Sequence, residues 1–249
     1  MVKITVLGYY GGYPFNGDGT SSYLVQTETF NLLLDCGSGA LIELEKHLDP
    51  LQLDAVILTH YHADHIADVG VLQHYWQLAK GNKKTPILPI YGHSLDQQNF
   101  EKLNWPNATK AYSYQVGQKL NLGPLSVTFF EVKHPVKTFA MRIMNSMTNE
   151  NFVFTGDTTT IDGLAEFAKN TDLLITDTNF LDIPDGPKWH LTASESGELA
   201  KNANTKLLMM SHLPQHVSTA DLIVAAQKSA GLIKVVTAYK GMVTVIDRQ

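Results

Sequence analysis

The chain has 249 residues, a formal net charge of −5 at pH 7 and one cysteine, Cys36. This length can bury a large core, and the single cysteine excludes a disulfide framework. Two arginines, Arg142 and Arg248, are too few for the basic stripe with which proteins grip long nucleic acids. The first residues lack the apolar core of a signal peptide, and no later run is long enough to span a bilayer. We therefore expect a cytoplasmic protein with no membrane partner.

Hydrophobic periodicity and turn residues predict the elements of the first half of the chain. A strand at residues 2–8 is followed by a glycine-rich loop at residues 9–20. Next come a hairpin, a helix, a buried strand, a long helix, a strand and a short helix, at residues 21–35, 40–47, 53–58, 64–79, 87–91 and 95–103. Because its apolar positions recur at helical spacing, the long helix is predicted to be continuous.

The second half is predicted to contain two groups of elements. A series of β segments at residues 111–143 comes first. Strands and helices then alternate, at residues 151–154, 161–169, 172–176, 193–202, 206–210, 219–230, 234–237 and 242–246. The pattern predicts an α+β fold of two mixed sheets packed face to face, with helices outside. Because no linker or charge block interrupts it, we expect a single domain over residues 1–249.

Residues 53–65, LDAVILTHYHADH, carry the strongest chemical signal. An apolar run typical of a buried strand leads directly into four residues of the metal-binding type. His60 and His62 are two apart, so in extended chain their imidazoles leave the same side. Asp64 and His65 are adjacent at the start of a helix, where their directions differ by about 100°. The spacing predicts two metal ions side by side.

Three more polar residues follow predicted strands, where α/β proteins place their chemistry. They are His134, Asp157 and His212. We expect one ion on His60, His62 and His134, a second on Asp64, His65 and His212, and Asp157 as the bridge between them. These nitrogen and oxygen ligands suit two divalent ions, Zn²⁺ first and Mn²⁺ as the alternative. Asp35, at the end of its strand, is expected to accept a hydrogen bond from a ligand imidazole.

The motif THYHADH, together with His134, the TGD at Asp157 and the SH at His212, resembles the metallo-β-lactamase superfamily. The resemblance covers nearly the whole chain. It implies an αββα sandwich with a dinuclear site at one edge. The motif is specific for the superfamily and not for the reaction, because thioester hydrolases, lactonases and phosphodiesterases share these ligands.

Further segments, including TSSYLV, LLLDCGSG, VFTGDT and HLTASESGELA, are similar to the ribonuclease Z branch. In that branch the histidine matching His190 assists catalysis. The run DHIADVGVLQ looks more like small cyclic-phosphate phosphodiesterases. Only 22 residues separate His134 from Asp157, where ribonuclease Z carries a long arm that binds the tRNA. The first loop also differs, because it carries Tyr9, Tyr10 and Tyr13.

The sequence therefore favours a dinuclear metal-dependent phosphodiesterase on small cyclic nucleotides or short nucleic-acid diesters. Asp64 would orient the nucleophile, and His190 would protonate the leaving alkoxide. A ribonuclease Z-type tRNA 3′ endonuclease, a lactone or thioester hydrolase, and a non-catalytic metal or nucleotide sensor are the alternatives. A large tRNA partner is not expected, and the resemblance implies a homodimer.

Overall fold

A computed structural model describes residues 1–247, and these residues separate into two compact units. The first unit contains residues 1–115, 122–124 and 239–245, and the second contains residues 116–121, 125–238 and the chain from Ile246. The single domain over 1–249 stays a prediction. Among the described helices, none has the length and hydropathy needed to cross a membrane.

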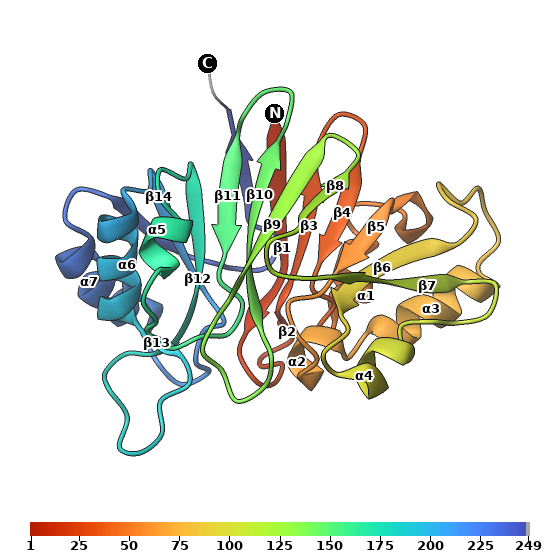
Figure 1. Ribbon diagram of the computed structural model, residues 1–249. Helices are drawn as coiled ribbons and strands as arrows, with labels where there is room; N and C mark the ends of the chain where they lie inside the picture. The colour runs from red at the N-terminus through yellow and green to blue at the C-terminus, as the bar shows by residue number, and fades with distance from the viewer. Residues whose placement is uncertain (248–249) are drawn as a thin grey trace. The chain divides into compact units, whose positions relative to one another are not determined.

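A mixed eight-stranded sheet forms the centre of the first unit (Figure 1). Its strands are β1 (Val2–Tyr10), β2 (Gly19–Thr20), β3 (Ser22–Gln26), β4 (Asn31–Leu34), β5 (Ala55–Ile57), β6 (Leu88–His93), β7 (Thr109–Tyr114) and β16 (Val243–Ile246). Strands β1, β3 and β4 pair antiparallel, whereas β4, β5, β6 and β7 pair parallel. The carboxyl ends of β4 and β5 therefore meet at the same edge of this sheet.

Helices cover one face of this sheet. They are α1 (Ala40–Leu44), α2 (Ala63–Ile66), α3 (Val69–Leu78) and α4 (Gln97–Glu101), with a short 3₁₀ turn at Pro50–Gln52. Leu24, Leu33, Val56 and Ile90 are partners in register on neighbouring strands, and all four pack in one buried cluster with Trp76 of α3. Burial of this row fixes the register, because a one-residue slip would turn every member to the opposite face.

The predicted continuous helix at 64–79 is wrong, because the chain forms α2 and α3 with a break at Asp68. The Asp68 backbone N–H donates to the Cys36 carbonyl at 3.1 Å, and the Asp68 carboxylate accepts from the Leu41 backbone N–H at 3.0 Å. Asp68 thus joins the 36–41 segment to the start of α3. The hydrophobic period continues across the break because both helices face the same core.

The second unit contains another mixed eight-stranded sheet. Its strands are β8 (Lys119–Leu122), β9 (Leu125–Glu131), β10 (Phe139–Asn145), β11 (Asn151–Phe154), β12 (Leu173–Phe180), β13 (Leu191–Thr192), β14 (Leu207–Ser211) and β15 (Lys234–Thr237). Strands β9, β10 and β11 pair antiparallel, and β11, β12, β14 and β15 pair parallel. Two mixed sheets with helices confirm the predicted α+β class.

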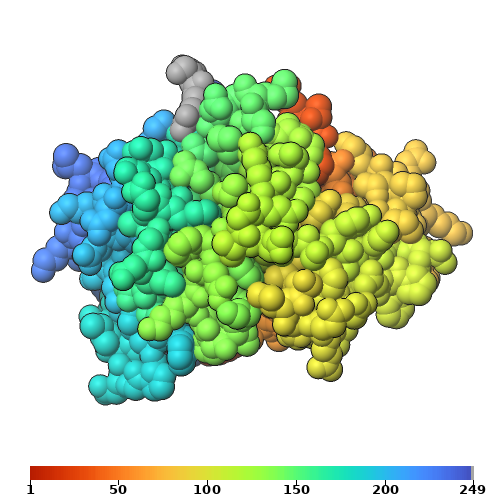
Figure 2. Space-filling view, in the orientation of Figure 1, coloured from red at the N-terminus to blue at the C-terminus, as the bar shows by residue number. Residues whose placement is uncertain are grey.

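Three helices belong to the second unit: α5 (Leu164–Phe167), α6 (Ala193–Ala203) and α7 (Thr219–Ala230). Helix α6 begins with a capping box, in which Thr192 and Glu195 satisfy each other's backbone N–H groups. Gly197 allows α7 to approach closely, because an added Cβ would lie 2.2 Å from the Ala226 carbonyl oxygen. The loop at residues 181–190, cyan in Figure 1, extends away from this sheet and projects at the lower left of Figure 2.

Candidate metal centre

The four residues of the HYHADH motif lie together beyond the carboxyl end of β5. The His60 ring lies 4.8 Å from the His62 ring and 4.1 Å from the His65 ring, between centroids. The Nε2 atom of His65 lies 3.5 Å from Asp64 Oδ2. His60, Asp64 and His65 are buried, and His62 is half-buried. Strand β5 thus places three imidazoles and a carboxylate within the reach of metal ions.

Asp35 fixes two of these imidazoles, that of His65 directly and that of His60 through the Thr59 hydroxyl. It follows β4, adopts a left-handed φ of 53° and is fully buried. His65 Nδ1–H donates to Asp35 Oδ2 at 2.7 Å, as predicted for Asp35. The Thr59 hydroxyl also donates to Asp35, at 3.0 Å, so its oxygen is the acceptor for His60 Nδ1–H, also at 3.0 Å. Both histidines therefore keep the lone pair of Nε2 for a ligand.

Asp64 is positioned by the glycine-rich loop of the same unit. The backbone N–H of Gly12 donates to Asp64 Oδ2 at 2.7 Å. A charge-assisted hydrogen bond of this length holds the carboxylate in one orientation. Sequence reasoning missed this contact, because a backbone donor leaves no residue-type signal.

The predicted donors of the second unit also lie at strand ends. Asp157 follows β11 by three residues, His212 directly follows β14, and His134 follows β9 by three residues. Asp157 Oδ2 lies 3.3 Å from His212 Nε2 and 3.7 Å from His134 Nε2. The side chains of all three residues are buried. One carboxylate oxygen thus faces two imidazole nitrogens, and the bridging role of Asp157 stays a prediction.

Asp177 is a further site residue that sequence reasoning missed. It lies within β12 and is 1% exposed. Its Oδ2 accepts hydrogen bonds from the Thr158 backbone N–H at 2.9 Å and from His190 Nδ1 at 2.7 Å. Its Oδ1 lies 3.2 Å from His212 Nδ1. The signal was present, because an aspartate near the carboxyl end of a parallel strand stands where Asp157 does.

His190 lies among the donors of the second unit. Its ring centroid is 5.0 Å from that of His212 and 5.3 Å from that of His134. The helix after it is capped by Thr192, so His190 has no capping role. With Nδ1 bound to Asp177, the Nε2 atom is the one that can exchange a proton with another molecule.

Four histidines of the two units share one pattern, which bears on their fitness for metal. Their Nδ1 atoms are hydrogen-bonded within the protein: to Thr59 for His60, Asp35 for His65, the Trp189 carbonyl for His134 and Asp177 for His190. The Nδ1 atom of His212 lies 3.2 Å from Asp177 Oδ1. Metal-ligating histidines are typically fixed in this way. In the second unit, Asp157, Asp177, His190 and His212 each offer a ligand atom within 4.8 Å of the others. These clusters are compatible with divalent metal binding.

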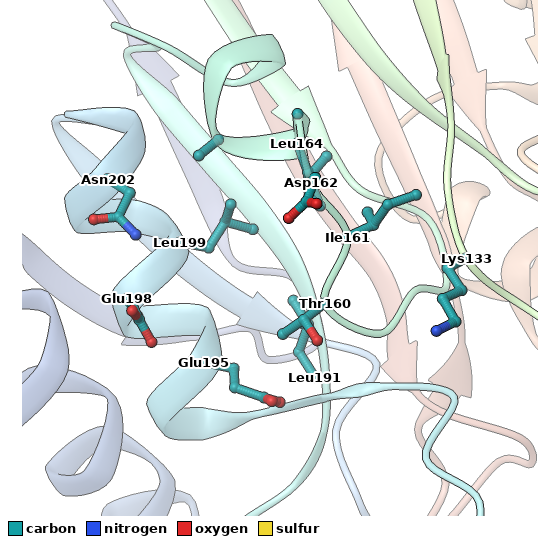
Figure 3. A pocket seen from close by; sticks show the side chains of 12 residues that line it. Lys133, Thr160, Ile161, Asp162, Leu164, Leu191, Glu195, Glu198, Leu199 and Asn202 are labelled. Atoms are coloured by element: carbon teal, nitrogen blue, oxygen red, sulfur yellow. The ribbon is translucent and has the colours of Figure 1, made fainter.

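A pocket of about 580 Å³ in the second unit lies beside α6 (Figure 3). Its apolar wall contains Leu191 and Leu199, and its polar lining contains the carboxylates of Asp162, Glu195 and Glu198. Figure 3 shows Lys133 apart from the two glutamates. Lys188 forms an ion pair with Glu195 at 2.6 Å, so Asp162 and Glu198 are left opposite Lys133, and this lining offers no excess of positive charge to a phosphodiester anion. We therefore do not assign this pocket to the phosphate of a substrate.

The family model of the metallo-beta-lactamase superfamily matches residues 15–212. The chain belongs to the metallo-β-lactamase superfamily. A similar relative in this superfamily is the probable metallo-hydrolase YhfI of Bacillus subtilis (strain 168). It is 42% identical over 215 residues, which cover 86% of this chain and 87% of YhfI. The crystal structure of YhfI matches 98% of this chain and 100% of its own, with 39% identity and a TM-score of 0.93.

Two more distant matches are named as enzymes that hydrolyse phosphate linkages. Ribonuclease Z of Haloarcula marismortui is 24% identical over 303 residues, covering 97% of this chain and 96% of that protein. The crystal structure of a diphosphatase from the PhnP family matches 99% of this chain and 98% of its own, with 17% identity and a TM-score of 0.75. The latter likeness concerns the metallo-β-lactamase fold alone.

Proposed function

We propose that this metallo-hydrolase is a phosphodiesterase that acts on small cyclic nucleotides or short nucleic-acid diesters. The observation that carries the proposal is His190, whose Nδ1 is held by buried Asp177 beside the donors of the second unit. Hydrolysis of a phosphodiester with an alkoxide leaving group needs a proton donor beside the leaving oxygen, because the alkoxide is a strong base. The name of the ribonuclease Z relative supports hydrolysis of a phosphodiester bond.

The ligand set that we propose is the one the sequence predicts. His60, His62 and His134 would hold one ion, Asp64, His65 and His212 would hold another, and Asp157 would contact both. The imidazole nitrogens of the set favour Zn²⁺, and its carboxylate oxygens suit Mn²⁺ as the alternative. When bound, two such ions supply a water of lowered pKa and neutralise charge on the phosphoryl oxygens.

The protein side chains supply orientation and proton transfer. Asp64, held by the Gly12 N–H, accepts a hydrogen bond from the attacking water and sets its direction. His190, protonated and held by Asp177, gives the proton of Nε2 to the departing oxygen. The Asp177 carboxylate stabilises the positive charge of that imidazolium before the transfer. His190 and Asp177 therefore act as an acid and the residue that positions it.

An acyl hydrolase of lactone or thioester type would use the same ligands. A thioester releases a thiolate, which is a much weaker base than a sugar alkoxide, so a held proton donor is of less use to a thioester hydrolase. A lactone releases an alkoxide, so the substrate screen decides that case. A non-catalytic metal or nucleotide sensor would have no need of His190 as a proton donor. The proposed homodimer is tested separately, by light scattering of the purified protein.

The deciding experiment is a hydrolysis screen of the metal-loaded protein. The substrates are bis-p-nitrophenyl phosphate, cyclic AMP, a lactone and a thioester. We expect the two phosphodiesters to be hydrolysed, and we expect chelation to abolish the activity and added Zn²⁺ or Mn²⁺ to restore it. Tyr112→Ala, at an exposed site on β7, serves as the control variant with unchanged activity. Hydrolysis of the lactone or thioester alone would refute the proposal.

A further inference from the structure

We propose that residues 9–18, the last two residues of β1 and the loop after it, here called the aromatic loop, bind the nucleobase of the substrate, with Tyr13 and Tyr10 as the stacking surfaces. The inference rests on the proposed phosphodiesterase function and adds the part of the substrate that is recognised. The loop has the sequence YYGGYPFNGD, which contains four aromatic rings and neither lysine nor arginine. It is therefore suited to an uncharged planar group and not to a phosphate.

The loop is fixed at its base. The Tyr9 hydroxyl donates to Asp18 Oδ2 at 2.8 Å, and Asp18 also forms an ion pair with Lys240. Phe15 and Asp18 exchange backbone hydrogen bonds at 2.9 and 3.0 Å around a turn in which Asn16 and Gly17 adopt positive φ. Asn-Gly is the preferred dipeptide for such a turn. A surface held in this way loses little entropy when a ligand binds.

The tip of the loop lies at the catalytic aspartate. Gly12, whose N–H bonds Asp64, has a φ of 74°, a conformation that glycine adopts without strain. Tyr13 is the next residue, and 53% of it is exposed. The backbone turns sharply there, because the Tyr13 N–H donates to the Gly11 carbonyl at 2.8 Å. An exposed ring therefore stands one residue from the contact that orients Asp64.

Of the other aromatic rings in the loop, one supports the loop from inside and one is partly exposed at its surface. Tyr9 is buried, and its hydroxyl is bound to Asp18, so it supports the loop. The Tyr10 ring lies 4.5 Å from Tyr9 and meets Phe15 edge to face at 5.8 Å, between centroids. Tyr10 is half-buried, which leaves part of its ring available. Aromatic side chains bind nucleobases by stacking without the need for a specific edge.

The test compares two ligands that differ only in the base, AMP and ribose 5-phosphate. Their affinities for the metal-loaded protein are measured by calorimetry, which needs no turnover. We expect the wild type to bind AMP about 5- to 100-fold more tightly than ribose 5-phosphate, as base stacking on an aromatic ring predicts. Tyr13→Ala should lose most of this preference by weakening AMP alone, and Tyr10→Leu should lose part of it.

The control is Tyr112→Ala, which removes a ring that is 41% exposed on β7 of the same unit and should keep the full preference. Equal affinities of AMP and ribose 5-phosphate for the wild type would overturn the inference. A full preference for AMP over ribose 5-phosphate in both Tyr13→Ala and Tyr10→Leu would also overturn the inference. Failure of the phosphodiesterase proposal gives a different result, in which no diester is hydrolysed and AMP is still preferred.

Discussion

The carboxylate of Asp177 joins His190 to His212, at 2.7 Å from Nδ1 of the first and 3.2 Å from Nδ1 of the second. One buried carboxylate thus hydrogen-bonds the proposed acid and lies beside Nδ1 of a proposed ligand. A substitution at Asp177 should affect proton transfer and metal affinity together, whereas a substitution at His190 should affect proton transfer alone.

Asp177→Asn tests this shared role. The amide keeps the volume of the side chain and removes the charge that both imidazoles face. We expect metal affinity to fall about 10- to 100-fold, as is usual for the loss of a carboxylate that holds a ligand histidine. Metal titration monitored by a competing chelator measures it. His190→Ala is the matched control, and a similar loss of affinity in that variant would contradict the division of roles.

The bridging assignment predicts unequal effects of two ligand substitutions. Asp157→Ala removes the oxygen that faces both His134 and His212, so it should lower the occupancy of both ions. His134→Ala should mainly weaken one. Metal content after gel filtration, measured by mass spectrometry, gives the stoichiometry directly. A full complement in Asp157→Ala would rule out the bridge.

The role of His190 as an acid predicts a dependence on the leaving group. A p-nitrophenolate departs readily without a proton, whereas a ribose alkoxide does not. His190→Ala should therefore slow cyclic AMP hydrolysis by about 10² to 10⁴ and bis-p-nitrophenyl phosphate hydrolysis much less. Steady-state kinetics on the two substrates provide the comparison. Equal losses would mean that His190 positions the phosphate instead of moving a proton.

We expect poor processing of precursor tRNA. The 22 residues between His134 and Asp157 contain β10, β11 and a short turn, with no segment left for a tRNA-binding arm. Each phosphate contact that is lacking removes part of the salt-dependent affinity for a folded RNA. Cyclic or short diesters should therefore show the higher kcat/KM at physiological salt, with one protein preparation used for all. Faster cleavage of the tRNA 3′ trailer would reverse the substrate assignment.

Asp96 allows a stability prediction that does not involve the metal centre. It caps α4 by accepting from Asn99, and hydrogen bonds from the side chain and backbone of Asn99 lower the pKa of Asp96. Asp96→Ala should cost about 1 kcal/mol of unfolding free energy at pH 7. Because the pKa of Asp96 is lower in the folded state than in the unfolded state, its stabilising contribution is full above the unfolded-state pKa of about 4. The contribution is lost as the pH falls through the folded-state pKa. Urea unfolding at pH 7 and pH 3.5 measures the change, and Asp96→Asn, which also caps, is the control.

Much of the fold was readable from local pattern. The bounds of β11, α7 and β15 agree with the prediction, since each has a continuous apolar pattern between clear turn residues. The predicted donors of each unit also lie together, because parallel strands end at a common edge. Where the pattern failed, a tertiary hydrogen bond decided the structure, as when Asp68 ended one helix and began another.

Two parts of the candidate site were missed, for different reasons. The strand predicted at 172–176 ends one residue before Asp177, so the sequence placed this carboxylate directly after a strand and the signal was overlooked; β12 itself continues to Phe180. The Gly12 contact with Asp64 spans 52 residues and uses a backbone donor, so no spacing rule reports it. This second contact depends on tertiary placement, which local periodicity does not encode.

The turn between β10 and β11 offers an attachment point for a reporter group. Strand β11 runs from this turn toward Asp157, so the turn lies at the opposite end of the strand from the donors. Met147, in the turn, is 82% exposed. Cys36 is the only native thiol, and burial raises its pKa well above the ordinary value, which makes it unreactive. A Met147→Cys variant would therefore accept a single fluorophore or surface tether while the donor side chains stay unmodified.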